Sequence, residues 1–152
     1  MRRFAPILLL IGSLGCSEKW TTYHDAEVRV SMPYQLGNFS RPGSLSIHRA
    51  GGATIISTNM HHGTYSLSFS PLAKKDHEPL RLAEEAIRAM KGVETSRQET
   101  TNDVWGRIED RAGEEFQLRC RVKKDRVYLL LAQGTKEFVH SANTVIVFDS
   151  FE

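Results

Sequence analysis

Apolar and polar residues alternate along much of this chain, and such alternation is typical of β-strands that bury one face. Val28, Val30 and Met32 alternate with polar neighbours, and Pro33 follows. Proline cannot donate a hydrogen bond to a strand ladder, so we expect this strand to end there. Similar patterns predict further strands over residues 19–24, 45–49, 54–60, 64–70, 105–110, 115–122 and 126–133, and a weak edge strand over 93–104.

The period changes to that of an α-helix between Lys74 and Lys91. Apolar residues recur there at helical spacing with charged residues between them, and Lys91-Gly92 ends the pattern. We therefore predict an amphipathic helix that packs on a sheet. The residues of its apolar stripe are Leu80, Ala83, Ile87 and Met90.

Residues 127–132 are apolar at every position, which predicts a central strand buried on both faces. Such a sheet needs a cover on each side. The C-terminal segment is ambiguous, because its β-branched residues favour a strand, whereas the spacing of Phe138, Ala142 and Val145 favours a helix. The need for a second cover leads us to predict a helix over about residues 136–147.

These elements predict an α/β (α+β) fold, in which a mostly antiparallel sheet of about six to seven strands is covered by helices on both faces. A chain of 152 residues has the length of one domain. Its 40% hydrophobic and 25% charged residues are ordinary for a folded globular protein, which excludes disorder and coiled coil. We expect a single domain over residues 19–152.

The first fifteen residues have the pattern of an export signal. Arg2 and Arg3 precede an almost unbroken apolar run over residues 4–14, and a small residue precedes Cys16. This run is about 11 residues long, whereas a membrane-spanning helix needs roughly 20. We therefore predict a signal peptide over residues 1–15 and no transmembrane helix in the mature chain.

Residues 13–16, Ser-Leu-Gly-Cys, resemble a bacterial lipobox. In that family the cysteine thiol is lipidated and becomes the mature N-terminus. The resemblance implies that Cys16 is the lipidation site and that residues 16–18 form a tether. It also implies an exported lipoprotein, anchored in a membrane and facing the periplasm or extracytoplasmic side. An ordinary secretory signal with an incidental cysteine is the alternative.

Removal of the signal changes the charge of the chain. The whole sequence has 20 Lys and Arg against 18 Asp and Glu, and residues 1–15 hold two arginines and no acid, which leaves 18 against 18. A neutral domain argues against nucleic acid as a partner, because neutralised phosphates dominate such binding.

If Cys16 carries lipid, we expect Cys120 to be a single buried thiol. A disulfide between the two is the alternative if lipidation fails.

Spaced hydrophobic, glycine and aromatic positions extend over most of residues 19–151. They include Val104-Trp-Gly-Arg107, segments 116–122 and 126–130, Gly134, and the closing Phe148-Asp-Ser-Phe151. This pattern resembles the PsbP-like domain of exported bacterial proteins, an α/β/α sandwich whose members are mostly uncharacterised. The resemblance implies a β-hairpin, a β-meander, a helix, a three-stranded meander and a terminal helix, and it carries no catalytic motif.

Two short clusters are candidate sites. His61-His62 suggests a metal site, but no further ligand follows at a completing spacing, and we interpret the pair as a polar turn before Gly63. Arg119 and Arg121 are weak candidates for binding an anionic ligand or a lipid headgroup. We favour instead cross-strand ion pairs with acidic residues of the neighbouring strand, namely Glu109, Glu114 and Glu115.

Aromatic residues before and within the first long loop either line a ligand pocket or form a lid over the core. The weak binding candidates among them are Trp20, Tyr34 and Phe39. We recognise no metal-ligand set, cofactor motif or catalytic constellation in the sequence. It therefore predicts a non-enzymatic accessory or binding module of the cell envelope, attached to a membrane through lipid on Cys16, with another envelope protein as a candidate partner.

Two other classes of function stay open. An intracellular interaction domain requires that residues 1–15 are retained. A small envelope hydrolase or metal-dependent enzyme requires at least two histidines to converge on a pocket with a carboxylate. The six histidines are His24, His48, His61, His62, His77 and His140.

Replacing Cys16 with Ser tests the predicted anchor. Two or three acyl chains make membrane attachment effectively permanent, so we expect Cys16→Ser to move the protein from the detergent phase to the aqueous phase in a phase-partition assay. A two-residue tether spans about 7 Å, which would bring Trp20 and Tyr23 to the membrane interface. If Cys16→Ser still partitions with membranes, the lipoprotein interpretation is wrong.

Overall fold

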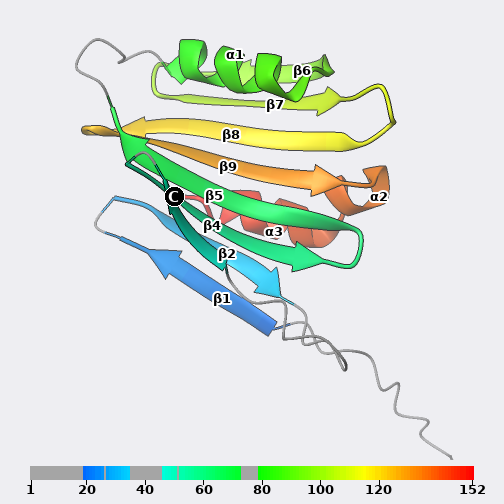
Figure 1. The fold of residues 1–152 in the computed structure, drawn as a ribbon, viewed down its shortest axis with the longest axis horizontal. Coiled ribbons are helices and arrows are strands. Elements are labelled where there is room, and N and C mark those ends of the chain that lie inside the picture. The colour runs from blue at the N-terminus through cyan, green and yellow to red at the C-terminus, as the bar shows by residue number, and fades with distance from the viewer. Residues whose placement is uncertain (1–18, 26, 35–45, 51, 73–78) are drawn as a thin grey trace, which may run out of the picture.

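The computed structural model describes residues 19–152 except residues 26, 35–45, 51 and 73–78. Within these described residues it contains nine strands and three helices, arranged as layers (Figure 1). In chain order they are β1 (Lys19–His24), β2 (Arg29–Tyr34), β3 (Ser46–Ala50), β4 (Ala53–Met60), β5 (Gly63–Pro71), α1 (Pro79–Met90), β6 (Val93–Glu99), β7 (Asp103–Glu109), β8 (Glu115–Lys123), β9 (Arg126–Gly134), α2 (Lys136–Val139) and α3 (Ala142–Asp149).

Seven of the described strands form one antiparallel sheet in the order β3-β4-β5-β9-β8-β7-β6. Strands β1 and β2 pair with each other in a separate two-stranded sheet. The predicted mixture of helices with a large antiparallel sheet is therefore confirmed. The first hairpin does not extend that sheet, and lies instead as a second layer against it.

Strand β9 is the middle strand of the seven and is apolar on both faces, as its sequence predicts. Tyr128, Leu130 and Ala132 are fully buried on one face. Their neighbours Leu129 and Leu131 point to the other face and are partly buried. Because β9 lies between β5 and β8, its two faces divide the interior into two hydrophobic cores.

The first core lies between the large sheet, the β1–β2 hairpin and α3. Val30 and Met32 of β2 pack there with Val147 and Phe148 of α3 and with Phe151. Backbone hydrogen bonds join Arg29 to Glu152 in both directions, and the Ser31 N–H donates to Ser150 Oγ at 2.9 Å. The C-terminus is thus fastened to the first hairpin, although the two are at opposite ends of the chain.

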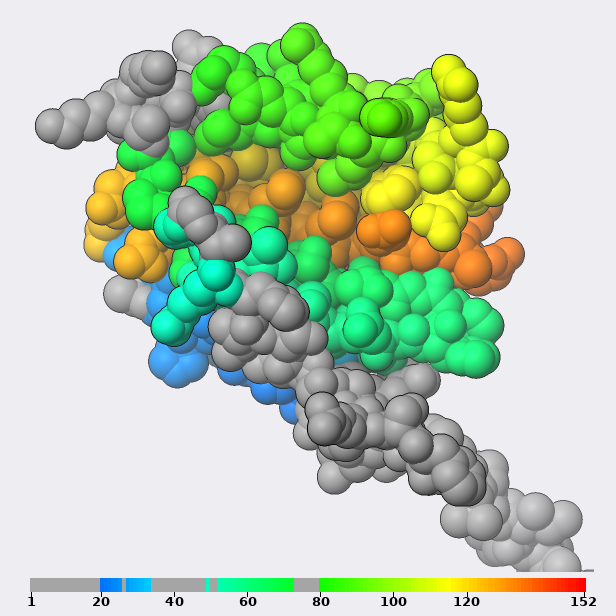
Figure 2. All heavy atoms as spheres, in the orientation of Figure 1, coloured from blue at the N-terminus to red at the C-terminus, as the bar shows by residue number. Residues whose placement is uncertain are grey.

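The second core lies under α1, which packs on β7 and β8. Ala83 is fully buried there, and Ile87 and Met90 pack against the same cluster. The predicted stripe is wrong at its first position, since Leu80 is 38% exposed and Leu82 contacts the core instead. Figure 2 shows atoms of β9, in orange, at the surface between green α1 and the teal strand β4, so α1 covers only part of this face.

The weak edge strand predicted over residues 93–104 is shorter in the structure. Strand β6 ends at Glu99, and Val104 belongs to β7. The Thr100 N–H donates to the Asp103 carbonyl at 2.7 Å, which closes a tight turn between the two strands. Three consecutive polar residues, 100–102, supply that turn.

The single helix predicted over residues 136–147 is two helices, α2 and α3. Ser141 interrupts them, because its hydroxyl caps α3 by accepting the Thr144 N–H. The break changes which residues of α3 face the core, so the predicted stripe holds at Phe138, which packs against the first core, but is wrong at Ala142 and Val145, which are exposed. Val145 is 52% exposed, and the buried residues of α3 are Thr144, Val147 and Phe148.

Replacing Leu130 with Ala tests the importance of the central strand. Leu130 is fully buried in β9, and such truncations cost about 2–5 kcal/mol. We expect the free energy of unfolding, measured by urea denaturation, to fall by that amount. The matched control is Leu80→Ala, which removes the same atoms from an exposed position and should change stability by less than about 1 kcal/mol.

Candidate functional site

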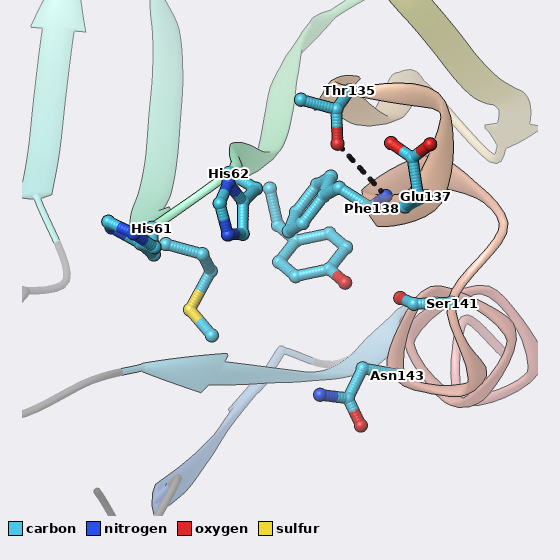
Figure 3. A pocket seen from close by; sticks show the side chains of 9 residues that line it. His61, His62, Thr135, Glu137, Phe138, Ser141 and Asn143 are labelled. Atoms are coloured by element: carbon cyan, nitrogen blue, oxygen red, sulfur yellow. Dashed lines mark hydrogen bonds between the residues drawn. The ribbon is translucent and has the colours of Figure 1, made fainter.

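A hollow of about 220 Å³ lies where the β4–β5 turn meets α2 and the start of α3. The turn contributes His61 and His62, α2 contributes Glu137 and Phe138, and α3 contributes Asn143 (Figure 3). The remaining lining residues are Met60, Tyr65, Thr135 and Ser141. Segments 70 or more positions apart in sequence therefore build this site, which we call the His62 pocket.

Local capping explains how α2 reaches the β4–β5 turn. The Thr135 hydroxyl caps α2 by accepting the Phe138 N–H at 3.3 Å. The Thr135 N–H in turn donates to the His62 carbonyl at 3.1 Å. A Cβ at position 63 would lie 2.3 Å from the Phe138 ring, so only Gly63 allows α2 to pack this closely on the strand.

Aromatic rings form the apolar wall of the pocket. The centroids of Tyr65 and Phe138 are 4.8 Å apart in a tilted arrangement. The Tyr65 hydroxyl lies 2.8 Å from Thr144 Oγ1, whose own proton goes to the Phe138 carbonyl at 2.8 Å. These bonds hold both rings against the start of α3, so the wall is rigid.

Polar groups surround this wall. Figure 3 shows His62 directed toward the helices, with His61 on its far side. Hydrogen bonds from its own backbone N–H and from Thr135 lower the pKa of Glu137, and His62 adds a smaller effect in the same direction. The pocket thus combines an apolar wall, a carboxylate anion and two imidazoles, a composition that suits a small, partly apolar ligand.

The predicted polar turn at His61-His62 is confirmed. The two rings meet edge to face with centroids 4.3 Å apart. Ser141 Oγ is occupied as the cap of α3. Within the described part of the chain no three His, Cys, Asp or Glu side chains are grouped to hold a metal ion.

The other histidines are elsewhere in the fold. His140 bonds the buried carboxylate of Glu115 at 2.6 Å, and Lys136 lies 3.5 Å from the same carboxylate. His24 is exposed on β1, and His48 belongs to β3. His77 lies outside the described residues.

Arg119 and Arg121 form ion pairs, as predicted, but with a different partner. Both bind Asp103 Oδ2, at 2.7 and 2.6 Å. Asp103 lies directly opposite Arg121 in the β7–β8 register. The predicted acidic partners were wrong because Glu109, Glu114 and Glu115 lie at the other end of this hairpin.

The same two guanidinium groups hold the C-terminus. Arg119 Nη1 donates to the carbonyls of Phe148 and Phe151 at 3.1 and 3.3 Å, and Arg121 Nη1 donates to that of Phe151 at 3.0 Å. Both also lie over the Phe151 ring. We call Asp103, Arg119, Arg121 and Phe151 the C-terminal clasp. Every nitrogen of both guanidinium groups thus donates to a group of the protein, which favours a structural role over ligand binding.

The electrostatics of the clasp favour an ionised Asp103. Burial alone would raise the pKa of this carboxyl, but the hydrogen bonds and charges of Arg119 and Arg121 outweigh burial and lower it. The side chains of Asp103, Arg119 and Arg121 are each between 15% and 18% exposed. The cluster is therefore a partly buried structural ion network.

The aromatic candidates do not form a site in the described residues. Trp20 is 39% exposed on β1, and Tyr34 is the last residue of β2. Tyr23 packs inward, with its ring 5.5 Å from that of Phe69, so it is not available at a membrane interface. Cys16 and Phe39 lie outside the described residues.

Cys120 is a free, buried thiol within the described part of the chain, as predicted. Burial raises its pKa to about 12, and the Asp103 carboxylate adds to this effect. The thiol is therefore protonated and unreactive at neutral pH. Its role is to pack beneath α1.

No protein-family model matches this chain, and a comparison with curated proteins finds no significant match. The sequence marks His61-His62 but not Tyr65, Glu137 and Asn143, which line the same pocket. No local signal marks these three residues, because they meet only through tertiary packing.

Among the described residues, no helix combines the length and hydrophobicity that a membrane crossing requires.

Replacing Asp103 with Asn removes the anion of the clasp. Leaving two partly buried guanidinium groups without a carboxylate should lower the free energy of unfolding by about 3 kcal/mol, near the lower end for broken buried pairs. Urea denaturation measures this. Asp149→Asn, at an exposed aspartate of α3, is the matched control and should change stability by less than about 0.5 kcal/mol.

The clasp also predicts a pH dependence. The pKa of Asp103 is lower in the folded protein than in the unfolded chain, where it is about 3.9. Its stabilisation is therefore present above pH ~4 and is lost as the pH falls through the folded-state pKa. We expect the stability difference between wild type and Asp103→Asn to shrink as the pH is lowered below about 4. A difference independent of pH contradicts this assignment.

Proposed function

We propose that this protein is an exported, lipid-anchored, non-enzymatic binding or accessory module of the cell envelope. The observation that carries the binding role is the His62 pocket, where rigid aromatic rings and a few polar groups from three segments converge. Such a combination is typical of small-ligand sites. The export role rests on residues 1–16, which lie outside the described residues.

The position of the first strand supports a short membrane tether. Strand β1 begins at Lys19, three residues after Cys16. Trp20 is 39% exposed on that strand, and an exposed tryptophan is favoured at the level of lipid headgroups. In this arrangement the domain lies close to the bilayer, with Trp20 as its contact.

We also propose that the fold is a PsbP-like α/β/α sandwich. The order of elements supports this: a hairpin, a three-stranded meander, a helix, a second meander of four strands where three were expected, and terminal helices. The closing residues Phe148 and Phe151 are both buried in the first core, as a family signature at that position requires. Fold analogy of this kind says nothing about the ligand.

A hydrolase is the second candidate function, and one observation favours it. His61, His62 and Glu137 line one hollow, which meets the requirement that two histidines share a pocket with a carboxylate. A hydrolytic base needs a partner that orients it and a nucleophile within reach. The one hydroxyl of the pocket at the start of α3, Ser141, is held as a helix cap. We therefore place binding ahead of catalysis.

Mass spectrometry of the native protein extracted from membranes tests the proposal. We expect a chain that begins at Cys16 and carries a diacylglyceryl group, together with a retained small ligand. Loss of that ligand in His62→Ala, and its retention in His24→Ala, would assign it to the pocket. His24 is an exposed histidine on β1 and so provides a matched control.

Two results contradict the proposal. A chain that retains Met1 and is recovered in the soluble cytosol excludes an exported lipoprotein. Turnover of ester or phosphoester substrates that disappears in His62→Ala but not in His24→Ala would establish the hydrolase instead.

A further inference from the structure

A second hollow, of about 310 Å³, lies on the outer strands β6, β7 and β8, away from the His62 pocket. The antiparallel register places its side chains next to one another: Gln98 lies opposite Trp105, and Arg107 lies between Ser96 and Gln117. We call this site the Trp105 groove. It is part of the sheet face that carries the C-terminal clasp, because Trp105 lies opposite Arg119 in the register.

Trp105 supplies a fixed aromatic surface in this groove. Its side chain is 36% exposed, although it is one of the largest apolar residues of the chain. The Arg119 guanidinium lies 5.6 Å from the centre of its ring, and Arg119 is itself held by Asp103 and the C-terminal carbonyls. The ring is therefore positioned by the clasp.

Arg107 is a cation without a carboxylate partner among the residues that the structure describes. Its hydrogen bond joins Nε to Gln117 Oε1 at 3.3 Å, and no ion pair involves it in the described part of the chain. The acidic residues nearby are Glu109, exposed at the end of the same strand, and Glu115, which already binds Lys136 and His140. The two terminal nitrogens of Arg107, Nη1 and Nη2, can therefore donate to both oxygens of a carboxylate.

We propose that the Trp105 groove binds an acidic saccharide, such as a uronic acid unit of an envelope glycan. The indole ring offers an apolar surface to the face of a sugar ring, and the amides of Gln98 and Gln117 suit its hydroxyl groups. The guanidinium of Arg107 matches the carboxylate in charge and geometry. The choice of a glycan rests on the proposed function, because export brings the domain to surfaces rich in such polymers.

Binding of oligogalacturonate to the purified full-length chain tests this inference. The chain has two tryptophans, so a Trp20→Phe background leaves Trp105 as the sole tryptophan reporter. We expect its fluorescence to change on titration with oligogalacturonate. A neutral oligogalactoside of equal length should bind at least about tenfold more weakly, since charge-assisted hydrogen bonds carry the difference.

Variants assign the binding to specific groups. In the same background, Arg107→Gln should weaken oligogalacturonate binding at least about tenfold and leave the neutral sugar unchanged. Arg111→Gln, at an exposed arginine in the β7–β8 turn, is the matched control and should bind as the parent does. Trp105→Ala, followed by calorimetry, should weaken both sugars, and a thermal melt verifies that it folds.

Three outcomes overturn the inference: no binding at millimolar concentration, equal binding of the acidic and neutral sugars, or an unchanged affinity in Arg107→Gln. Tighter binding of adenosine monophosphate than of oligogalacturonate would assign the groove to a nucleotide instead. These results do not depend on whether Cys16 is lipidated, so failure here is distinguishable from failure of the proposed function.

Discussion

The burial of both faces of β9 is the constraint on which the rest of this structure depends. A strand that is apolar at successive positions is stable only between two covers, and no single helix supplies both. Accordingly, α1 packs on one face of the sheet, and the first hairpin and α3 cover the other. The two cores share β9, so any change that loosens it affects both.

The C-terminal clasp holds the last residues of the chain on the sheet. The last residues must stay on the sheet to complete the first core, yet they form only a short helix and a tail. Arg119 donates to the carbonyl of Phe148 in the last turn of α3, and both arginines donate to that of Phe151 just after it, which also opposes the partial negative charge at this helix end. Asp103 balances one of their two positive charges while the network holds the tail.

The two candidate sites, the His62 pocket and the Trp105 groove, both adjoin the packed layers. The His62 pocket forms where α2 and α3 meet the turn that follows β4. The Trp105 groove forms on β6, β7 and β8. Tyr65, which is buried in the first core, and Arg119, which holds the C-terminal residues of that core, also fix the aromatic wall of the adjoining site. Stability and candidate binding thus depend on some of the same side chains.

Local sequence determined those features that need only neighbouring residues. The alternation of Val28, Val30 and Met32 predicted a strand with a buried face, and the unbroken apolar run of β9 predicted its central place. In each case burial is set by period, which is a property of the sequence itself.

Tertiary structure decided which distant residues meet. Arg121 binds Asp103 because strand register places the two residues directly opposite each other, and Arg119, two residues away on β8, reaches the same carboxylate. The break at Ser141 changed which residues of α3 face the core, because a new helix that begins at this cap has its own orientation. The His62 pocket joins the β4–β5 turn to α2 and α3. No local pattern specifies such a meeting, since it exists only once the two covers have packed on β9.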